Sequence, residues 1–281
     1  MYDKNKFVCD AAANDILQET MRLEQKYSFF LDDSIIGKIN SRTESKVPID
    51  DESFKIISES IALSKATNSI FDIALAGTMK KLQHEKNLKS FHKKFDKLTP
   101  YAHSNQISIA NGIISFSNPY TKIDLGGVVK EYAVDLSADI IRKYKIGSAI
   151  VDFGGDMAFI GDKNGAGWRV GIKNPKEPSL DIAIIVLSDK ALATSGHYER
   201  SYTVGGKVFS HIISSPEDKM PKPLQASVIC DKAMVAGVFA TTLSISGFAI
   251  TTSSYQLESV VVQNDMSLDT ALSTTLIFEN K

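Results

Sequence analysis

Two glycine pairs, each close to an aspartate, have the residue types and spacing to bind a phosphate. Asp124 precedes Leu125-Gly126-Gly127, and Asp156 directly follows Gly154-Gly155. Glycine lets backbone amides approach a ligand closely, and the N-terminus of a helix offers unpaired N–H groups to an anion. A lone Asp beside a helix N-terminus is more often a helix cap. Ligand binding at Asp124 therefore requires a second group aimed at the same place, which Asp156 could supply.

The elements that must position these groups lie within residues 120–175. This segment predicts a strand, a Gly-Gly turn, an amphipathic helix, a strand, the second Gly-Gly turn and a further strand. The apolar side chains of the helix recur every three or four residues, as they do on one helix face: they are Val129, Tyr132, Ala133, Leu136 and Ile140.

The rest of the chain mixes helical and strand patterns, which predicts an α+β fold. The Asn111-Gly112 pair between two apolar runs predicts a tight hairpin. Residues 80–105 predict solvated surface, and residues 193–196 predict a turn. Because the chain has no internal repeat and no break in composition, we expect one domain over residues 1–281. Further helices are expected over residues 10–27 with Asp10 as N-cap, up to Asn40, over 51–67 and over 231–246, and further strands over 182–188, 198–204, 207–213, 227–230 and near the C-terminus.

The overall composition argues against several classes of function. The 281 residues carry a formal net charge of −1, so there is no electrostatic case for binding nucleic acid or a membrane surface. No run approaches the ~20 apolar residues of a membrane span. The N-terminus lacks the apolar region of a secretory signal, so we expect a cytoplasmic protein, or a periplasmic one whose export signal has been removed. Cys9 and Cys230 have no metal-binding spacing and are expected to be free thiols.

Common nucleotide-binding and nucleophile motifs are absent from the sequence. There is no G-x-G-x-x-G after a first strand, no P-loop and no G-x-S-x-G. Two polar runs remain as candidates, F-S-H-I-I with His211 and T-S-G-H-Y-E-R from Thr194 to Arg200. Each is weak alone, because a single His on a strand is more often structural and a polar run is more often a turn.

Taken together and in order, these motifs resemble the ApbE-type flavin transferases, which move FMN from FAD onto a Thr of a target protein. The resemblance covers nearly the whole chain and implies an ApbE-like (T-fold-like) α+β fold of mixed sheets with flanking helices. The matching elements are Tyr27-Ser28-Phe29-Phe30 through Asn40, Ile70-Phe71-Asp72, D-L-G-G-V-V-K-E-Y-A-V-D from Asp124 to Asp135, Gly154-Gly155-Asp156, Trp168 to Pro175, Thr194 to Arg200 and His211-Ile212-Ile213.

The resemblance also implies roles for individual side chains. Aromatic and apolar groups would pack against the flavin nucleotide, polar groups would hold FAD, and His211 would assist proton transfer as the catalytic residue. The implied FAD-binding residues are Phe30, Ile70, Phe71, Asp72, Asp124, Lys130 beside the pyrophosphate, and Ile213, which with His211 flanks the reacting phosphate.

The sequence departs from the family pattern at its metal site. The family's A-D-A-x-x-T places an Asp and a Thr on one helix face, where this chain has Gly237 and Thr241. The resemblance therefore leaves Gly127 and Thr241 as metal-site positions without that carboxylate, and we expect Mg²⁺ binding to be severely weakened, since a hard cation is usually anchored by a carboxylate. In addition, the family's K-G-Y becomes Lys130-Glu131-Tyr132, which adds a charge near the phosphate site.

Three functions follow from these matches and departures. The first is an FAD:protein FMN transferase that acts on an acceptor protein with a Thr-containing motif and releases AMP, with its activity impaired by the change at position 237. The alternative is a degenerate relative that binds FAD without transferring FMN. The third, a structural protein that no longer binds flavin, ranks last because Asp124, Phe71-Asp72 and the glycine pairs remain.

Overall fold

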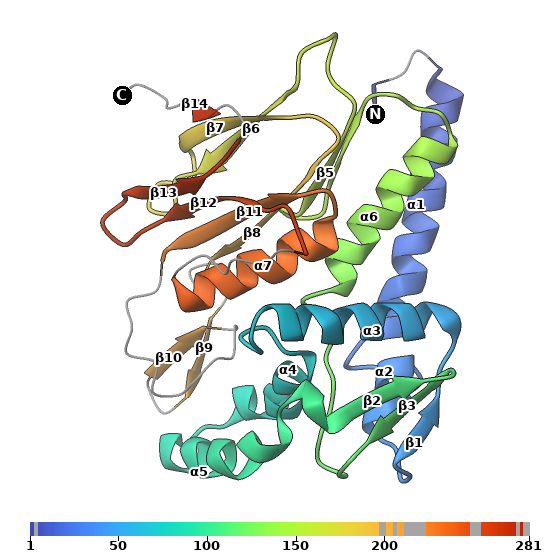
Figure 1. Cartoon of the computed structure of the whole chain (residues 1–281), viewed down its shortest axis with the longest axis vertical. Helices are drawn as coiled ribbons and strands as arrows, with labels where there is room; N and C mark the ends of the chain where they lie inside the picture. Colours follow the sequence, from blue (N-terminus) through green and yellow to red (C-terminus); the bar gives the residue numbers. More distant parts are fainter. Residues whose placement is uncertain are drawn as a thin grey trace. The chain divides into compact units, whose positions relative to one another are not determined.

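The computed structural model divides the chain into two compact units, and each is described by itself (Figure 1). Unit 1 consists of Met1–Arg22, Lys130–Gly196 and Lys222–Lys281, and unit 2 of Leu23–Val129 and His197–Pro221. The structure describes residues 1–2, 5–196, 201–204, 207–210, 223–247, 254–273 and 276–277.

Unit 1 is built on a six-stranded sheet with the strand order β13-β12-β11-β8-β5-β4. A second, three-stranded sheet has the order β14-β7-β6. All strand pairs in these two sheets, over the described residues, are antiparallel. The strands are β4 (Ala149–Asp152), β5 (Met157–Ile160), β6 (Trp168–Lys173), β7 (Asp181–Leu187), β8 (Ala191–Gly196), β11 (Gln225–Cys230), β12 (Glu258–Val262), β13 (Leu268–Ala271) and β14 (Leu276–Ile277).

Alternation along the strands gives the large sheet two apolar faces. Phe159, Leu192 and Ile229 point to one face, where they pack with apolar residues of β6 and β7. Ala158 and Ala191 are their strand neighbours and point to the other face, where they pack with apolar residues of α1 and α6. Successive side chains of a strand face opposite sides, so the sheet forms the middle layer of unit 1.

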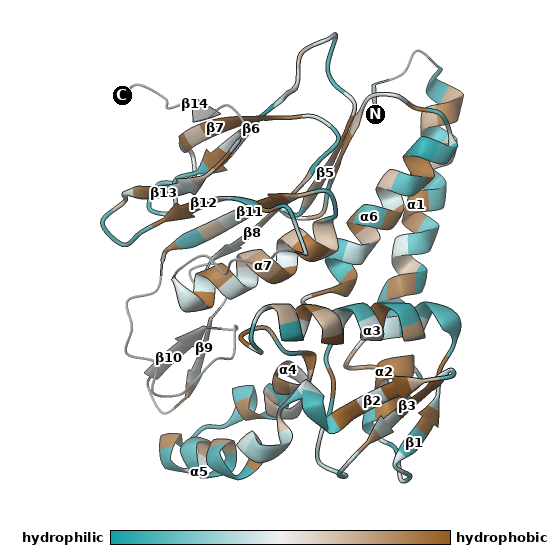
Figure 2. Cartoon of the chain, viewed as in Figure 1, coloured by the Kyte–Doolittle hydropathy of each residue, from teal (hydrophilic) through white to brown (hydrophobic). Residues whose placement is uncertain are grey.

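Within the described residues, the helical layer of unit 1 contains α1 (Lys6–Tyr27) by its part up to Arg22, α6 (Val129–Lys143) and α7 (Ala233–Ser246). Helix α7 is buried almost all round, and Figure 2 shows it mostly brown and white, without a continuous hydrophilic face. It packs against β8 and β11. None of the helices in the described part of the chain has both the length and the apolar character needed to cross a membrane.

The N-terminus of α7 is capped by a residue from another helix. Lys232, at the N-cap position, makes no capping bond with its side chain. Instead, the carboxylate of Asp135 on α6 accepts hydrogen bonds from the backbone N–H groups of Ala233 (2.7 Å) and Met234 (3.1 Å), 98 and 99 residues away in the sequence. Burial raises the pKa of Asp135 to about 6. A buried helix end thus receives its cap through the tertiary structure.

Unit 2 combines the helices α2 to α5 with a small sheet of order β1-β3-β2 and the antiparallel pair of β9 and β10. Capping side chains begin α2, α3, α4 and α5, namely Ser34, Asp50, Asp72 and Asn87. The elements are α2 (Ile35–Asn40), β1 (Lys46–Pro48), α3 (Asp51–Ala66), α4 (Ile73–Met79), η1 (Lys80–His84), α5 (Leu88–Leu98), η2 (Thr99–Tyr101), η3 (Ser104–Gln106), β2 (Ile107–Ala110), β3 (Ile113–Phe116), β9 (Ser201–Val204) and β10 (Lys207–Ser210).

The segment before Asp124 is held by side chains instead of a neighbouring strand. The Asn40 amide donates to the Ile123 carbonyl (2.8 Å) and accepts from the Ile123 N–H (2.9 Å). The Thr78 hydroxyl accepts from the Lys122 N–H (3.0 Å). Gly77 lets α4 approach this closely, because a Cβ there would lie 2.3 Å from the Ile123 carbonyl carbon. A side-chain amide thus takes the place of a strand partner.

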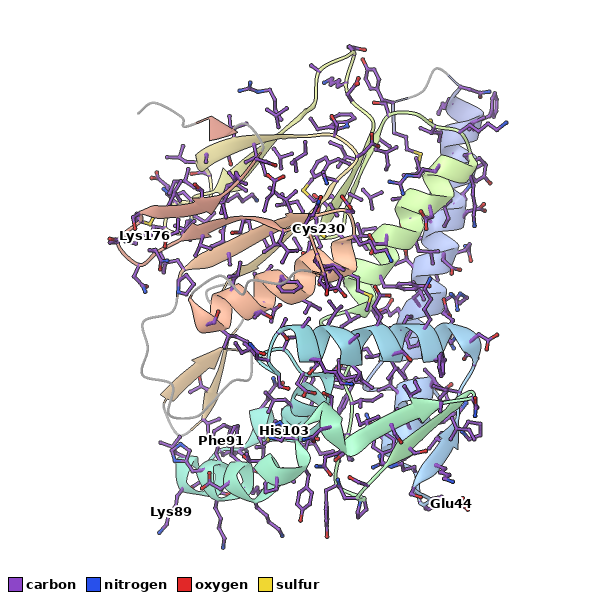
Figure 3. All side chains as sticks on the ribbon, viewed as in Figure 1. Glu44, Lys89, Phe91, His103, Lys176 and Cys230 are labelled. Carbon is purple, nitrogen blue, oxygen red and sulfur yellow. The ribbon has the colours of Figure 1, made fainter. Side chains whose placement is uncertain are left out.

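Most predicted elements are confirmed, including the α+β class, the hairpin at Asn111-Gly112 and the helices that begin after Asp50 and end near Asn40. Both described thiols, Cys9 and Cys230, are free as predicted, and Figure 3 marks Cys230 in unit 1.

Four predictions about local structure are wrong. Residues 121–124, all of them described, join no strand ladder. Their backbone N–H groups are bonded instead by the side chains of Asn40, Thr78 and Asn118 and by the carbonyl of Ile73. Residues 193–196 continue strand β8, where they pair with β11, instead of turning. Helix α1 begins at Lys6, so Asp10 lies inside it.

The fourth concerns residues 80–105, which contain the amphipathic helix α5. Phe91 and Phe95 are buried on one side of this helix. Lys89 projects outward from it (Figure 3). The many lysines of this stretch concealed the apolar spacing that the buried face follows.

We expect Asp135→Ala to lower the free energy of unfolding by about 1–2 kcal/mol, because it leaves two N–H groups at the start of α7 without their acceptor. Urea unfolding followed by circular dichroism measures the change. Asp139→Ala is the matched control, since Asp139 lies one turn later on α6 and makes only an exposed ion pair with Arg142. Equal stability of the two variants would show that the cap contributes nothing.

Asn40→Ala is expected to lower the free energy of unfolding by about 1–3 kcal/mol, because both polar backbone atoms of Ile123 lose their hydrogen-bond partner inside unit 2. Asn105→Ala serves as the control, since Asn105 is exposed and its side chain accepts a hydrogen bond from the neighbouring Gln106. Thermal unfolding of both variants tests this. A loss for Asn40→Ala no larger than for the control would mean that water replaces the amide without cost.

Candidate functional site

Asp124 is buried, and both of its carboxylate oxygens have partners within unit 2. Oδ1 accepts a hydrogen bond from the backbone N–H of Gly126 (2.8 Å), and Oδ2 pairs with Nζ of Lys80 (2.8 Å). A Cβ on Gly126 would lie 3.1 Å from Oδ1, so glycine gives the carboxylate room to fold back onto the turn. Asp124 therefore shapes the turn before α6 and orients a lysine.

That lysine lies beside two aromatic rings. Nζ of Lys80 is 5.8 Å from the ring centroid of Phe29 and 5.5 Å from that of Phe30. Phe29 and Phe30 meet edge to face at 5.7 Å, and Phe30 is 75% exposed. An exposed ring next to an ammonium group could stack on a planar ligand while the ammonium pairs with an anion.

Of the predicted flavin-pocket residues, Phe71 and Asp72 are buried, and Ile70 is half-buried. A Cβ on Gly127 would lie 3.5 Å from the ring of Phe71, so the predicted metal-site position Gly127 and Phe71 are neighbours within unit 2. Both oxygens of Asp72 are already bonded to backbone, Oδ1 to the N–H of Ala74 (2.8 Å) and Oδ2 to the N–H of Ser104 (2.9 Å). Asp72 thus has a clear structural task.

In unit 1, Lys130 lies between two buried carboxylates. Its Nζ forms an ion pair with Oδ2 of Asp156 and lies 3.9 Å from Oε1 of Glu131. Glu131 and Asp156 are 6% and 3% exposed. Burial and, after it, the charge of the neighbouring Asp156 hold the pKa of Glu131 well above its ordinary value.

The Glu131 side chain occupies the space next to Gly237 on α7. A Cβ on Gly237 would lie 2.6 Å from Cγ and 3.1 Å from Cδ of Glu131. Thr241, one helical turn after Gly237, is half-buried. The predicted lack of a carboxylate on α7 is thus accompanied by a carboxylate that reaches the same place from α6.

One carboxylate oxygen of Glu131 in unit 1 lacks a hydrogen-bond partner. Oε2 of Glu131 is buried and has no hydrogen-bond partner among the residues that the structure describes. Over the same residues, no three His, Cys, Asp or Glu side chains gather into a cation site. Glu131 and Asp156 therefore form a pair, which suits a Mg²⁺ ion that takes one or two carboxylates and completes its shell with water and phosphate oxygens.

The second glycine pair has a conformational task. Gly154 and Gly155 have φ angles of 69° and 93°, in the region that glycine adopts at little cost. Asp152 accepts a hydrogen bond from the N–H of Gly155 (2.8 Å). This turn places Asp156 directly before β5.

The T-S-G element, which the sequence marked as polar, ties three elements of unit 1 together. The Thr194 and Ser227 hydroxyls lie 2.9 Å apart and join β8 to β11. The Ser195 and Ser244 hydroxyls lie 3.2 Å apart and join β8 to α7. Thr194 therefore helps to hold two strands together, and Ser195 helps to hold α7 against the sheet.

The structure brings Asp124 and Phe30 together through Lys80, which the sequence had not indicated. It also pairs Lys130 with Asp156 and places Glu131 at Gly237. The joint change at positions 131 and 237 was a signal for that contact. His211 and Ile213 lie outside the described residues, so their roles stay predictions.

Comparison with known proteins agrees with these motifs. A family model described as the ApbE family matches residues 2–261. The FAD:protein FMN transferase of Vibrio cholerae serotype O1 is 24% identical over 236 residues, which cover 80% of this chain and 70% of that protein. The one of Rhodobacter capsulatus is 32% identical over 145 residues, which cover 50% of this chain and 27% of that protein.

Solved structures show the same fold. The ApbE protein of Thermotoga maritima has a TM-score of 0.82 at 23% identity and covers 96% of this chain, with 91% of its own chain covered. The flavin transferase ApbE of Vibrio cholerae has a TM-score of 0.80 at 21% identity, with 97% and 90% covered. Because the family model spans most of the sequence, this chain belongs to the ApbE family.

Proposed function

We propose that this chain is an FAD:protein FMN transferase, which moves FMN from FAD onto a Thr or Ser hydroxyl of an acceptor protein and releases AMP. The observation that carries the proposal is the Lys80 ammonium, held by the buried Asp124 carboxylate beside the exposed ring of Phe30. This arrangement offers an aromatic surface and a cation together, as a flavin nucleotide requires. Membership of the ApbE family supports the same reaction.

The proposed roles divide according to chemistry. Phe30 stacks on a ring of FAD, and Ile70, Phe71 and Asp72 line the flavin pocket. Lys130 and the backbone N–H groups at the start of α6 offset phosphate charge. Asp124 acts on FAD through Lys80 and through the turn that it closes.

In the proposed transfer, the acceptor hydroxyl oxygen forms a bond with the phosphorus of the FMN half. The bond from that phosphorus to the bridging oxygen breaks, and AMP leaves with the bridging oxygen. The hydroxyl proton passes to a base, for which we propose His211. Mg²⁺, when bound, would offset the negative charge of the pyrophosphate.

A second candidate is a protein that binds FAD without transferring FMN. Gly237 favours this function, because α7 offers no carboxylate at that position. For a protein with this second function, we expect tight FAD binding without release of AMP.

Incubation of the full chain with FAD and a Thr-containing acceptor peptide, with MgCl₂ or with EDTA, separates the two. We expect AMP release and a mass gain of one FMN on the peptide, both dependent on Mg²⁺. Chromatography measures the AMP, and mass spectrometry measures the peptide. Tight FAD binding without AMP would favour the second candidate, and no FAD binding would exclude both.

Phe30→Ala is expected to raise the Kd for FAD by about 2- to 10-fold, because one aromatic stacking contact is worth about 0.5–1.5 kcal/mol. Phe30 is 75% exposed, so its truncation leaves folding intact. Phe7→Ala is the matched control, since Phe7 on α1 is 88% exposed and has no proposed role. Flavin fluorescence titration gives both constants, and the same Kd for the two variants would contradict the role of Phe30.

A further inference from the structure

The carboxylates of Glu131 and Asp156 are an unusual pair, because both are buried and they share one lysine. They come from different elements, α6 and the turn before β5. The Lys130 ammonium pairs with Oδ2 of Asp156 and stays 3.9 Å from Oε1 of Glu131. One positive charge therefore faces two buried negative groups.

The single charge of Lys130 does not neutralise both carboxylates. Its side chain is 47% exposed, whereas those of Glu131 and Asp156 are 8% and 4% exposed. Oε2 of Glu131 has no partner within the described residues. A buried carboxylate oxygen without a partner is costly. A proton on Glu131 would remove its charge and let its carboxyl group share a hydrogen bond with Asp156, whereas a cation would pair with both carboxylates in their charged form.

The position of Glu131 depends on the glycine opposite it. Any side chain at 237 would collide with Glu131, since a Cβ there would lie 2.6 Å from Cγ. Glycine inside a helix costs about 1 kcal/mol relative to alanine. The packing reason for this glycine is the Glu131 side chain that lies against it, with Oε1 3.3 Å from that Cβ position.

We propose that Glu131 and Asp156 bind a divalent cation of the Mg²⁺ type, and that Glu131 supplies from α6 the carboxylate that α7 lacks at Gly237. A hard cation takes oxygen ligands, and Mg²⁺ commonly combines one or two carboxylates with water and substrate phosphates. Two buried carboxylates with an unpartnered oxygen fit that requirement. The part that this cation plays in FMN transfer rests on the proposed function, whereas its binding does not.

Titration of the full chain with Mn²⁺ alone, without FAD or acceptor, tests the site. Electron paramagnetic resonance of free Mn²⁺ gives the affinity and the number of ions bound. We expect wild type to bind one ion, and Glu131→Gln and Asp156→Asn each to bind it about tenfold more weakly or worse. Asp139→Asn is the matched control on α6, since Asp139 is exposed, and its affinity should stay within about twofold of wild type.

A reciprocal exchange tests where the carboxylate must be. The double variant Glu131→Gly, Gly237→Asp moves the carboxylate from α6 to α7 and removes the collision. We expect it to bind Mn²⁺ at least fivefold more tightly than Glu131→Gln. Binding no tighter than that of Glu131→Gln would overturn the assignment of Glu131 to this place.

Two further results would overturn the proposal: no Mn²⁺ bound by the wild type, or wild-type affinity in Glu131→Gln. Circular dichroism confirms that each variant is folded, and Asp156→Asn provides a second test if Glu131→Gln is not. Intact Mn²⁺ binding without AMP release would contradict the proposed transfer and leave the cation site standing. The two failures are therefore distinguishable.

Discussion

The carboxylate of Asp135 bonds the first N–H groups of α7 to α6, and the site in unit 1 depends on that contact. Helix α7 is buried and has no capping side chain of its own, so its N-terminus needs an acceptor from elsewhere. Residues four apart lie on one helix face. The cap between Asp135 and Ala233 therefore sets a register in which Glu131, one turn earlier, meets Gly237, one turn later. The hydrogen bonds that cap α7 thus also position the Glu131 carboxylate.

In unit 2, polar side chains bond backbone groups that have no partner in a helix or strand. The segment that leads to Asp124 has no strand beside it, yet its backbone polar groups must be satisfied. The Asn40 amide and the Thr78 hydroxyl do so, and Gly77 lets α4 come close enough. Asp124 is thereby held firmly enough to fix both its turn and Lys80.

The glycines near the charged groups act for different physical reasons. Gly154 and Gly155 adopt positive φ angles, which most residues avoid. Gly126 gives room to the Asp124 carboxylate, and Gly237 gives room to Glu131. Within each unit, the absence of a glycine side chain therefore sets the position of a buried carboxylate. A substitution at Gly237 would act on the position of a carboxylate, and not only on the helix that contains it.

The sequence by itself determined the α+β class, the hairpin at Asn111-Gly112, the helix that begins after Asp50 and the ApbE family, because turn residues, apolar periodicity and motifs can be read from the chain without its partners. Only the tertiary structure decided that residues 193–196 continue a central strand, that Asp135 caps α7 and that Glu131 fills the space at Gly237. Each of these contacts joins residues that are distant in the sequence. No local pattern records such a partner, since it is chosen by the packing of sheets and helices around buried polar groups.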